Sequence, residues 1–272
     1  MTPSSSSAEP TPPPEYFRVS PPLLRRVPAV AKRGGRLSPK LPTLVLLALF
    51  AQAARRPKSE LAIASASAAQ MASVSFSPRM SEVLEDMGYR RRGPEFSGSA
   101  WSAVTGCIKR LAETTVTVPF MWKPPGKKVL AAAVFKGPLL ELVNGDTSQV
   151  RLYGYSPPKD RYHALVPRRL LALRPDLSEL GTRLACWLYA QHRGARKDGK
   201  LKHKWSMQIT PEWLVEAKFL RSKNVRRATE LNRIRNGFTN LEGLGLLSII
   251  GSGWPFMIQL SPAFFHQDGA GE

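Results

Sequence analysis

The sequence has few of the residues that build metal centres and disulfide frameworks. Its 272 residues include two cysteines, Cys107 and Cys186, and four histidines. A secreted disulfide scaffold or a cysteine zinc site needs more thiols at closer spacing, so both cysteines are expected to be buried in a protein of a reducing compartment. No two histidines form a His-x-His pair, which excludes the metal-dependent nicking chemistry that uses such a pair. We therefore expect no metal and no cofactor.

The motifs of common catalytic centres are missing as well. No G-x-x-x-x-G-K-[ST] segment occurs, which excludes ATP hydrolysis by a phosphate-binding loop of that type. There is no His-x-x-Arg of the kind that tyrosine recombinases use, and the acids are scattered rather than clustered for two-metal catalysis. The sequence predicts a protein that is not an enzyme.

Long apolar runs are also scarce. The apolar run at residues 41–54 is shorter than the roughly 20 residues that a helix needs to cross a bilayer. It follows a proline-rich leader, which argues against a secretory signal. We expect a cytoplasmic protein without a membrane partner.

Acidic residues are outnumbered two to one. The chain has 40 Lys and Arg against 20 Asp and Glu, which gives a formal net charge of +20 at pH 7. A surface so basic binds polyanions because binding releases their counterions. Arginine, which outnumbers lysine here, can make bidentate hydrogen bonds to phosphate and to guanine. Nucleic acid is the expected partner.

The composition changes along the chain and suggests four segments. Residues 1–36 are rich in proline, serine and arginine and are expected to form a disordered tail, either a passive extension or a loose tether on DNA phosphates. We predict a first folded domain at 37–164, a second at 165–266 and a disordered end at 267–272. The Ala/Ser-rich stretch 59–75 is either a helix extension or a floppy insertion.

The two predicted domains show the same order of elements. An apolar helix ending near Gln52 has a counterpart ending near Gln191. Ser77-Pro78 and Thr210-Pro211 then mark helix starts, because an N-cap hydroxyl accepts an unpaired amide and a proline at the first helical position sacrifices none. A third helix follows in each domain, with apolar positions at helical spacing. These positions are Trp101, Val104, Ile108 and Leu111 in the first domain, and Val225, Ala228, Leu231, Phe238 and Leu241 in the second.

Strand-like segments and turns complete both domains. They lie at 114–118 and 129–135 in the first domain and at 246–250 and 256–260 in the second, separated by Gly/Pro-containing turns. The order helix, helix, helix, strand, turn, strand is typical of a winged helix-turn-helix. We predict an α+β, mostly helical fold with two tandem winged helix-turn-helix domains.

The strongest functional signal is the third helix of the second domain, with the segment leading into it. A helix-turn-helix places the N-terminal part of this helix in the major groove, where arginine can contact guanine; the plainer alternative is a solvated basic face. The predicted base-reading residues are Arg221, Ser222, Asn224, Arg226, Arg227, Glu230 and Arg233.

Other basic segments suit phosphate contact. The loop at 192–204 carries Lys and Arg around two glycines, so it is either a phosphate clamp beside the groove or a solubilising loop. The predicted phosphate contacts are Arg193, Arg196, Lys197, Lys200, Lys202 and Lys204 in this loop, Lys223 before the third helix, and Lys127 and Lys128 in the first domain's turn. Further first-domain candidates, for DNA or for a protein partner, are Arg90, Arg91, Arg92, Ser99, Ser102, Lys109 and Arg110.

Over residues 37–265 the chain resembles the iteron-binding plasmid replication initiators, the Rep family with tandem winged-helix domains. The carriers are the two helix sets, Ile209-Thr210-Pro211, the segment 224–247 and the closing Ile258–Pro262. The resemblance implies a prokaryotic origin-binding protein, associated with nucleoid or plasmid, whose second module reads direct repeats in double-stranded DNA. It also implies a host replication initiator and a helicase as partners, and a homodimer that represses while monomers initiate.

Two other functions fit parts of the pattern. A winged-helix transcription regulator usually carries one such module with a ligand or dimerisation domain, so the repeated order argues against it. A basic RNA-binding protein would be expected to show an aromatic RNP motif or a GXXG loop. Neither motif occurs in the sequence.

Overall fold

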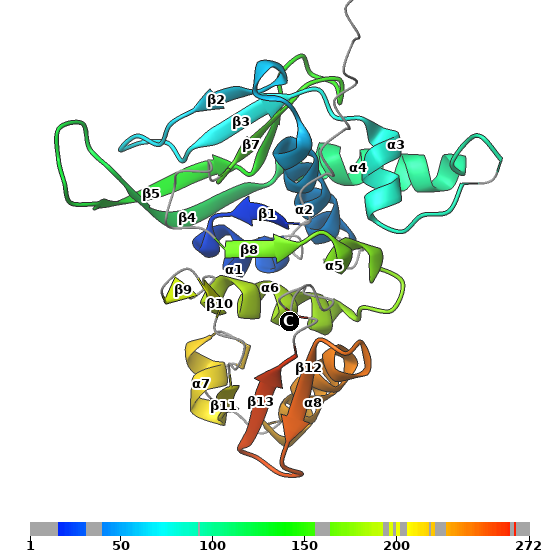
Figure 1. Cartoon of the computed structure of the whole chain (residues 1–272), viewed down its shortest axis with the longest axis vertical. Coiled ribbons are helices and arrows are strands. Elements are labelled where there is room, and N and C mark those ends of the chain that lie inside the picture. The colour runs from blue at the N-terminus through cyan, green and yellow to red at the C-terminus, as the bar shows by residue number, and fades with distance from the viewer. Residues whose placement is uncertain are drawn as a thin grey trace, which may run out of the picture.

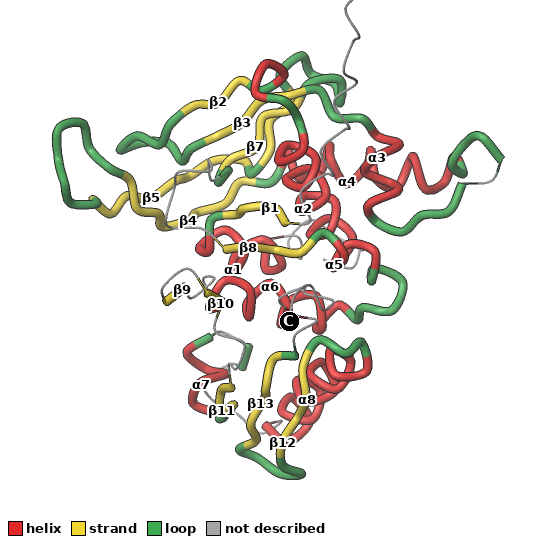
Figure 2. Tube along the Cα trace, viewed as in Figure 1, coloured by secondary structure: helices red, strands yellow, loops and turns green. Residues whose placement is uncertain are grey.

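Figures 1 and 2 present a computed structural model of the chain, which describes residues 16–30, 40–91, 93–155, 164–192, 196–197, 200–201, 206–217, 219–220, 227–261 and 264. For 26–30, 192, 196–197, 200–201 and 227 it describes the backbone alone. Helices alternate with small antiparallel sheets along the chain. The predicted α+β class is therefore confirmed.

The N-terminal part is organised around helix α2 (Lys40–Arg55). Its residues from Pro42 to Ala53 are all buried, the pattern of a helix that is covered on every side. Helices α3 (Met80–Asp86) and α4 (Gly98–Glu113) both pack against α2. The start of α4 is fixed by Ser97, whose Oγ accepts a hydrogen bond from the Ala100 N–H at 3.3 Å.

Helix α3 begins later than the sequence predicts. The expected start at Ser77-Pro78 is wrong, because the helix starts at Met80 and Arg79 stands at its N-cap without a side-chain cap. Gln52 of α2 supplies the missing contact. Its Oε1 accepts from the Arg79 N–H at 3.1 Å, and its Nε2 donates to the Arg79 oxygen at 2.6 Å. A hydrogen bond from another helix has replaced the local cap.

Two separate sheets accompany these helices. The four-stranded sheet has the order β2-β3-β7-β6 and contains β2 (Ala62–Ala64), β3 (Ser73–Phe76), β6 (Leu140–Leu142) and β7 (Val150–Tyr153). Strands β4 (Thr115–Trp122) and β5 (Ala131–Pro138) form a hairpin of their own. The stretch 59–75 is thus not a helix extension, because it contains the end of the short helix η1 (Lys58–Glu60), β2 and the start of β3.

The leader contains regular structure. Strand β1 (Tyr16–Val19) pairs antiparallel with β8 (Ala164–Pro167), and helix α1 (Pro21–Val30) packs on α6 (Glu179–His192). Phe17 is 1% exposed, and Val19, Leu23 and Leu24 are fully buried. The prediction of a disordered tail is therefore wrong for residues 16–30, because apolar groups distant in the sequence bury these side chains.

In the C-terminal part the main elements follow the order helix, strand, helix, helix, strand, strand. After α6 come β11 (Ser206–Ile209), α7 (Pro211–Glu216), α8 (Arg227–Gly243), β12 (Leu247–Ile250) and β13 (Phe256–Leu260), with the sheet order β11-β13-β12. The predicted cap of α7 is confirmed, since Thr210 Oγ1 accepts from the Trp213 N–H at 3.1 Å. The helix ends at Glu216, whereas the sequence predicts an end at Leu220.

The N-terminal elements α2, β3, α3, α4, β4 and β5 follow this same order, but their strands pair differently. β3 pairs with β2 and β7, whereas β4 and β5 pair with each other. The ends of the two helices that the sequence comparison matches also differ in burial. Gln52 is buried, whereas Gln191 is exposed. The order of elements is repeated, and the sheets are not.

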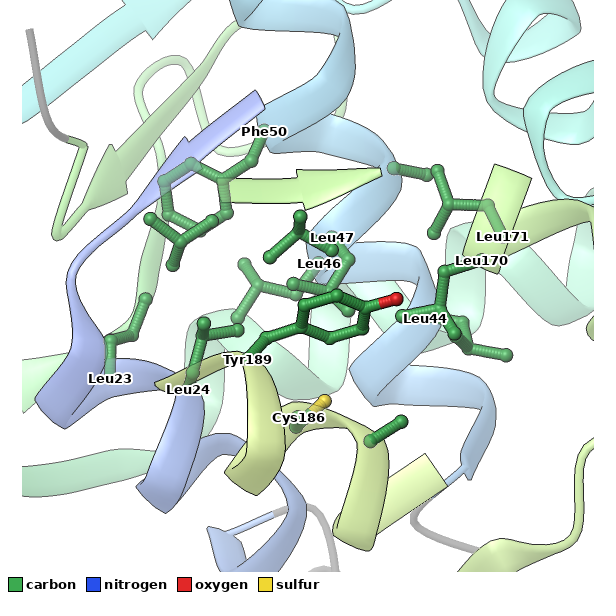
Figure 3. Close-up of a cluster of buried hydrophobic side chains, with 14 of the residues drawn as sticks. Leu23, Leu24, Leu44, Leu46, Leu47, Phe50, Leu170, Leu171, Cys186 and Tyr189 are labelled. Atoms are coloured by element: carbon green, nitrogen blue, oxygen red, sulfur yellow. The ribbon is translucent and has the colours of Figure 1, made fainter. Parts of the chain in front are cut away.

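One apolar core runs through both parts of the chain. Figure 3 shows Leu23 of α1, Phe50 of α2, Leu170 of α5 (Arg169–Ala172) and Tyr189 of α6 within this cluster. The Tyr189 hydroxyl donates to the backbone oxygen of Phe264 at 3.1 Å, and the two rings stack at 4.0 Å. The predicted boundary between residues 164 and 165 falls inside β8, whose partner strand β1 belongs to the leader.

Candidate nucleic-acid interface

The start of α8 is only partly covered by the core. Ala228 is exposed, so the predicted apolar stripe is wrong there, whereas Leu231 is half-buried and packs against the core. Burial begins at Ile234, which is 3% exposed, and continues at Phe238 and Leu241. The exposed residues at the start of the helix are Ala228, Thr229, Glu230, Asn232 and Arg233.

A close crossing with α6 positions α8. A Cβ atom added at Gly237 would lie 2.8 Å from both Leu180 Cγ and Leu184 Cδ1, so any other residue would require these neighbours to shift. Less than one turn further on, Asn240 Oδ1 accepts a hydrogen bond from the Ser178 N–H at 2.7 Å. These contacts fix the end of α8 that is buried and leave its start free to meet a partner.

Positive charge gathers near this crossing. Arg233 lies about one turn before Gly237, and its side chain is exposed. Burial lowers the pKa of the Arg183 guanidinium on α6, and the positive charge of Arg233 lowers that pKa further. The Arg183 guanidinium also lies over the Phe219 ring, 5.2 Å from its centroid. The charge of Glu179 opposes the effect of Arg233 on the Arg183 pKa, and a further anion beside the two arginines would be favoured.

Arg235 ties α8 to the turn between β12 and β13. Its Nη2 donates to the Gly251 oxygen at 2.8 Å and its Nη1 donates to the Gly253 oxygen at 3.0 Å. The guanidinium also lies 5.2 Å from the centroid of the Phe256 ring. Charge-assisted hydrogen bonds of this kind are stronger than neutral ones, so the turn and the helix are held together. The basic run in the sequence did not reveal this structural role.

The predicted base-reading residues are only partly placed. Glu230 and Arg233 are exposed at the start of α8, where a reading role requires them. Arg227 is the first residue of α8 and is described by its backbone alone. The remaining members, together with the phosphate candidate before the helix, lie outside the described residues: Arg221, Ser222, Lys223, Asn224 and Arg226.

The basic loop after α6 contains two short strands that the sequence did not predict. β9 (Arg196–Lys197) pairs antiparallel with β10 (Lys200–Leu201). This pairing brings the backbones of Lys197 and Lys200 opposite each other. The other predicted clamp residues, Arg193, Lys202 and Lys204, lie outside the described part of the chain.

Two of the first-domain candidates make contacts within the protein. Arg91 Nε donates to Glu85 Oε1 at 2.9 Å, and its guanidinium lies over the Phe96 ring. Arg110 bends back along α4, where its Nε donates to the Gly106 oxygen at 3.1 Å. Both side chains therefore stabilise their own surroundings, a use that charge alone did not reveal.

The other first-domain candidates are exposed, apart from Arg92, which lies outside the described residues. Arg90 precedes α4, and Lys127 and Lys128 occupy the turn between β4 and β5. Ser99, Ser102 and Lys109 lie on α4. The Ser99 hydroxyl is 3.2 Å from that of the capping Ser97.

The exposure of Trp101 differs from the prediction. The sequence placed it on the apolar face of α4, yet its side chain is 45% exposed, while the neighbouring Ala100 is 6% exposed. The buried face runs through Ala100, Val104, Cys107, Ile108 and Leu111, so the predicted apolar face is confirmed at Val104, Ile108 and Leu111 and wrong only at Trp101. The tryptophan therefore shares the outer side of α4 with Ser102 and Lys109, which are exposed as well.

The buried carboxylate of Asp86 connects helix α3 to helix α2 and to the residue that precedes α5. Asp86 of α3 has a fully buried side chain that pairs with Arg55 of α2 and with Arg168. The Arg168 Nε donates to Asp86 Oδ1 at 2.7 Å, immediately before α5 begins. Burial raises the pKa of the Asp86 carboxyl, and the two guanidinium groups oppose that rise. The network connects the N-terminal helices to the segment that leads into α6.

Comparison with family models, with curated protein sequences and with solved structures gives no match for this chain. Among the helices that the structure describes, none combines the length and the apolar character needed to cross a bilayer. In the same described residues, no three His, Cys, Asp or Glu side chains gather as ligands for a metal ion. Function must therefore be argued from the site itself.

Proposed function

We propose that this chain is a non-enzymatic, sequence-specific double-stranded DNA-binding protein of the plasmid replication-initiator type. In this proposal it binds direct repeats at an origin in the prokaryotic cytoplasm and recruits a host replication initiator and a helicase. The observation that carries the proposal is the start of α8, where Glu230, Asn232 and Arg233 are exposed on a helix whose other end is buried in the core.

The proposal includes a winged helix-turn-helix in the C-terminal part. Its support is the element order α6, β11, α7, α8, β12, β13 together with the sheet order β11-β13-β12. In that assignment α7 and α8 are the helix-turn-helix, α8 enters the major groove, and the turn between β12 and β13 is the wing. The hydrogen bonds of Arg235 then hold the wing at a fixed position relative to the recognition helix.

Contact with phosphates would complete this binding surface. The positive charges of Arg183 and Arg233 interact beside α8, and Glu179 offsets part of this repulsion. A DNA phosphate near both would relieve their mutual repulsion. The repeated order of elements in the N-terminal part favours a second, weaker DNA contact and hence the initiator type over a regulator with one module.

Replacing Arg233 with alanine is expected to weaken binding to the cognate duplex by about 1–3 kcal/mol if the arginine contacts a base. The double variant Arg226→Ala/Arg227→Ala, chosen from the sequence, should abolish the preference for repeats over mixed-sequence DNA. Fluorescence anisotropy at fixed salt measures the affinity for the cognate duplex and the preference for repeats. Lys58→Ala, which removes an exposed charge elsewhere, is the control. Unchanged affinity and discrimination in the α8 variants would contradict the assigned role.

A further inference from the structure

The hairpin of β4 and β5 forms an arm whose end, the loop at residues 123–130, lies beyond the part that packs on the core. Its strands pair without interruption from Thr115 opposite Pro138 to Trp122 opposite Ala131. The inner face of the hairpin packs on the core for most of its length, since Val118, Phe120 and Phe135 are at most 5% exposed and Trp122 also packs against the core. Figure 1 shows the arm leaving the body of the molecule and ending in a loop beyond every neighbouring element. Eight residues of strand correspond to a length of roughly 26 Å.

The end of this arm, residues 123–130, is basic, and a backbone hydrogen bond closes its turn. Every charged residue between positions 114 and 140 is a lysine: Lys123, Lys127, Lys128 and Lys136. The Lys127 N–H donates to the Pro124 oxygen at 3.1 Å, and Gly126 adopts a φ of +70°, which suits a residue without a Cβ. The turn is therefore preordered before any partner binds.

Apolar side chains stand beside these lysines in full contact with solvent. Val129 is 77% exposed, more than any other exposed large hydrophobic residue of the described chain. Val134 and Met121 follow with 59% and 51%, on the outer face of the same hairpin. Pro125 at the tip is exposed as well. An exposed apolar group next to several cations at the end of an arm indicates a contact surface.

We infer that the tip of the β4–β5 arm enters the minor groove of duplex DNA, with Val129 as an apolar wedge and Lys127 and Lys128 on the flanking phosphates. Proteins that bind the minor groove combine cations with apolar side chains that press between base pairs and bend the duplex. The segment 123–130 contains no Arg, Asn, Gln or acid, so lysine is its only charged side chain. The tip would thus read the shape of the groove.

This inference rests on the proposed function and adds a second, sequence-independent contact to it. The binding energy of α8 and of the lysines would offset the cost of unstacking a base step. The expected consequence is a bent complex, in which the bend depends on Val129 while most of the affinity does not.

The test uses the full chain and a duplex from the DNA flanking its gene, labelled at both ends with a fluorescent donor and acceptor. Energy transfer reports the bend, and anisotropy reports the affinity. For Val129→Ser, we expect most of the bend to be lost, while the affinity changes by less than about fivefold, or about 1 kcal/mol. Val129→Met should keep the bend. Val143→Ser, which alters a residue that is 41% exposed outside the arm, should change neither quantity.

The lysines provide a separate readout. Lys127→Ala/Lys128→Ala should reduce the slope of log affinity against log salt by roughly 0.9 per lost phosphate contact. An unbent wild-type complex would overturn the inference, as would a bend that survives Val129→Ser. Loss of self-association in Val129→Ser without a change in the bend would also overturn the inference, because the tip would then contact protein and not DNA. Failure of the wild type to bind any duplex would instead refute the proposed function.

Discussion

Replacing Asp86 with alanine is expected to lower the free energy of unfolding by about 3 kcal/mol, the lower end of the range for breaking a buried ion pair. The Asp86 side chain is fully buried, whereas those of Arg55 and Arg168 are 14% and 33% exposed. Removal of the carboxylate leaves Arg168 partly buried without its counter-charge, while Arg55 retains only the more distant Glu82, at 4.0 Å. Their partial exposure to water is the reason for choosing the lower value.

Chemical denaturation of the full chain measures this loss. Glu85→Gln is the matched control, because Glu85 also pairs with an arginine of the same region but is 44% exposed. An exposed pair contributes about 0–1 kcal/mol, so the control should remain close to the wild type. A loss for Asp86→Ala that equals the loss for the control would show that the network does not link these helices.

The second large effect is expected at Gly237. Replacing it with valine should cost about 3 kcal/mol, because overpacking a tight contact costs about 1–3 kcal/mol and a β-branched residue adds rotamer strain. The added Cβ alone would meet Leu180 and Leu184 at 2.8 Å. Relief of this clash requires the leucine side chains or α8 itself to shift, and a shift of α8 would be measured as a loss of affinity for DNA.

Gly243, at the end of the same helix, offers a direct control. A Cβ at Gly243 would meet no atom within 4 Å, so Gly243→Ala should be neutral or stabilise the protein by up to about 1 kcal/mol. Thermal and chemical unfolding of both variants separate a packing defect from a general intolerance of α8 to substitution. Equal stability of Gly237→Val and the wild type would mean that the two helices do not depend on this crossing.

Local chemistry explains which elements could be predicted from the sequence. The hydroxyl-proline signal at Thr210-Pro211 marks the start of α7, because its cap is formed by residues within one turn. The strand β13 was predicted with its observed ends, since its side chains alternate between buried and exposed. Helices α2 and α4 follow from their apolar content in the same way.

Contacts between distant residues explain what could not be predicted. Tyr16 is opposite Pro167 in the pairing of β1 with β8, so the composition of the leader alone cannot show its burial. The start of α3 depends on Gln52 in another helix. The structural uses of Arg91, Arg110 and Arg235 likewise depend on partners that a count of charges does not include.

The central claim is that this chain recognises specific sites in duplex DNA, and footprinting on the DNA that flanks its gene tests it most directly. The account predicts protection of several direct repeats at constant spacing by the wild type, with protection greatly reduced for Arg233→Ala under the same salt. Protection of a single palindrome at a promoter would contradict the initiator assignment and favour a transcription regulator. Absence of any protected sequence, at concentrations that coat the DNA uniformly, would contradict sequence-specific recognition itself.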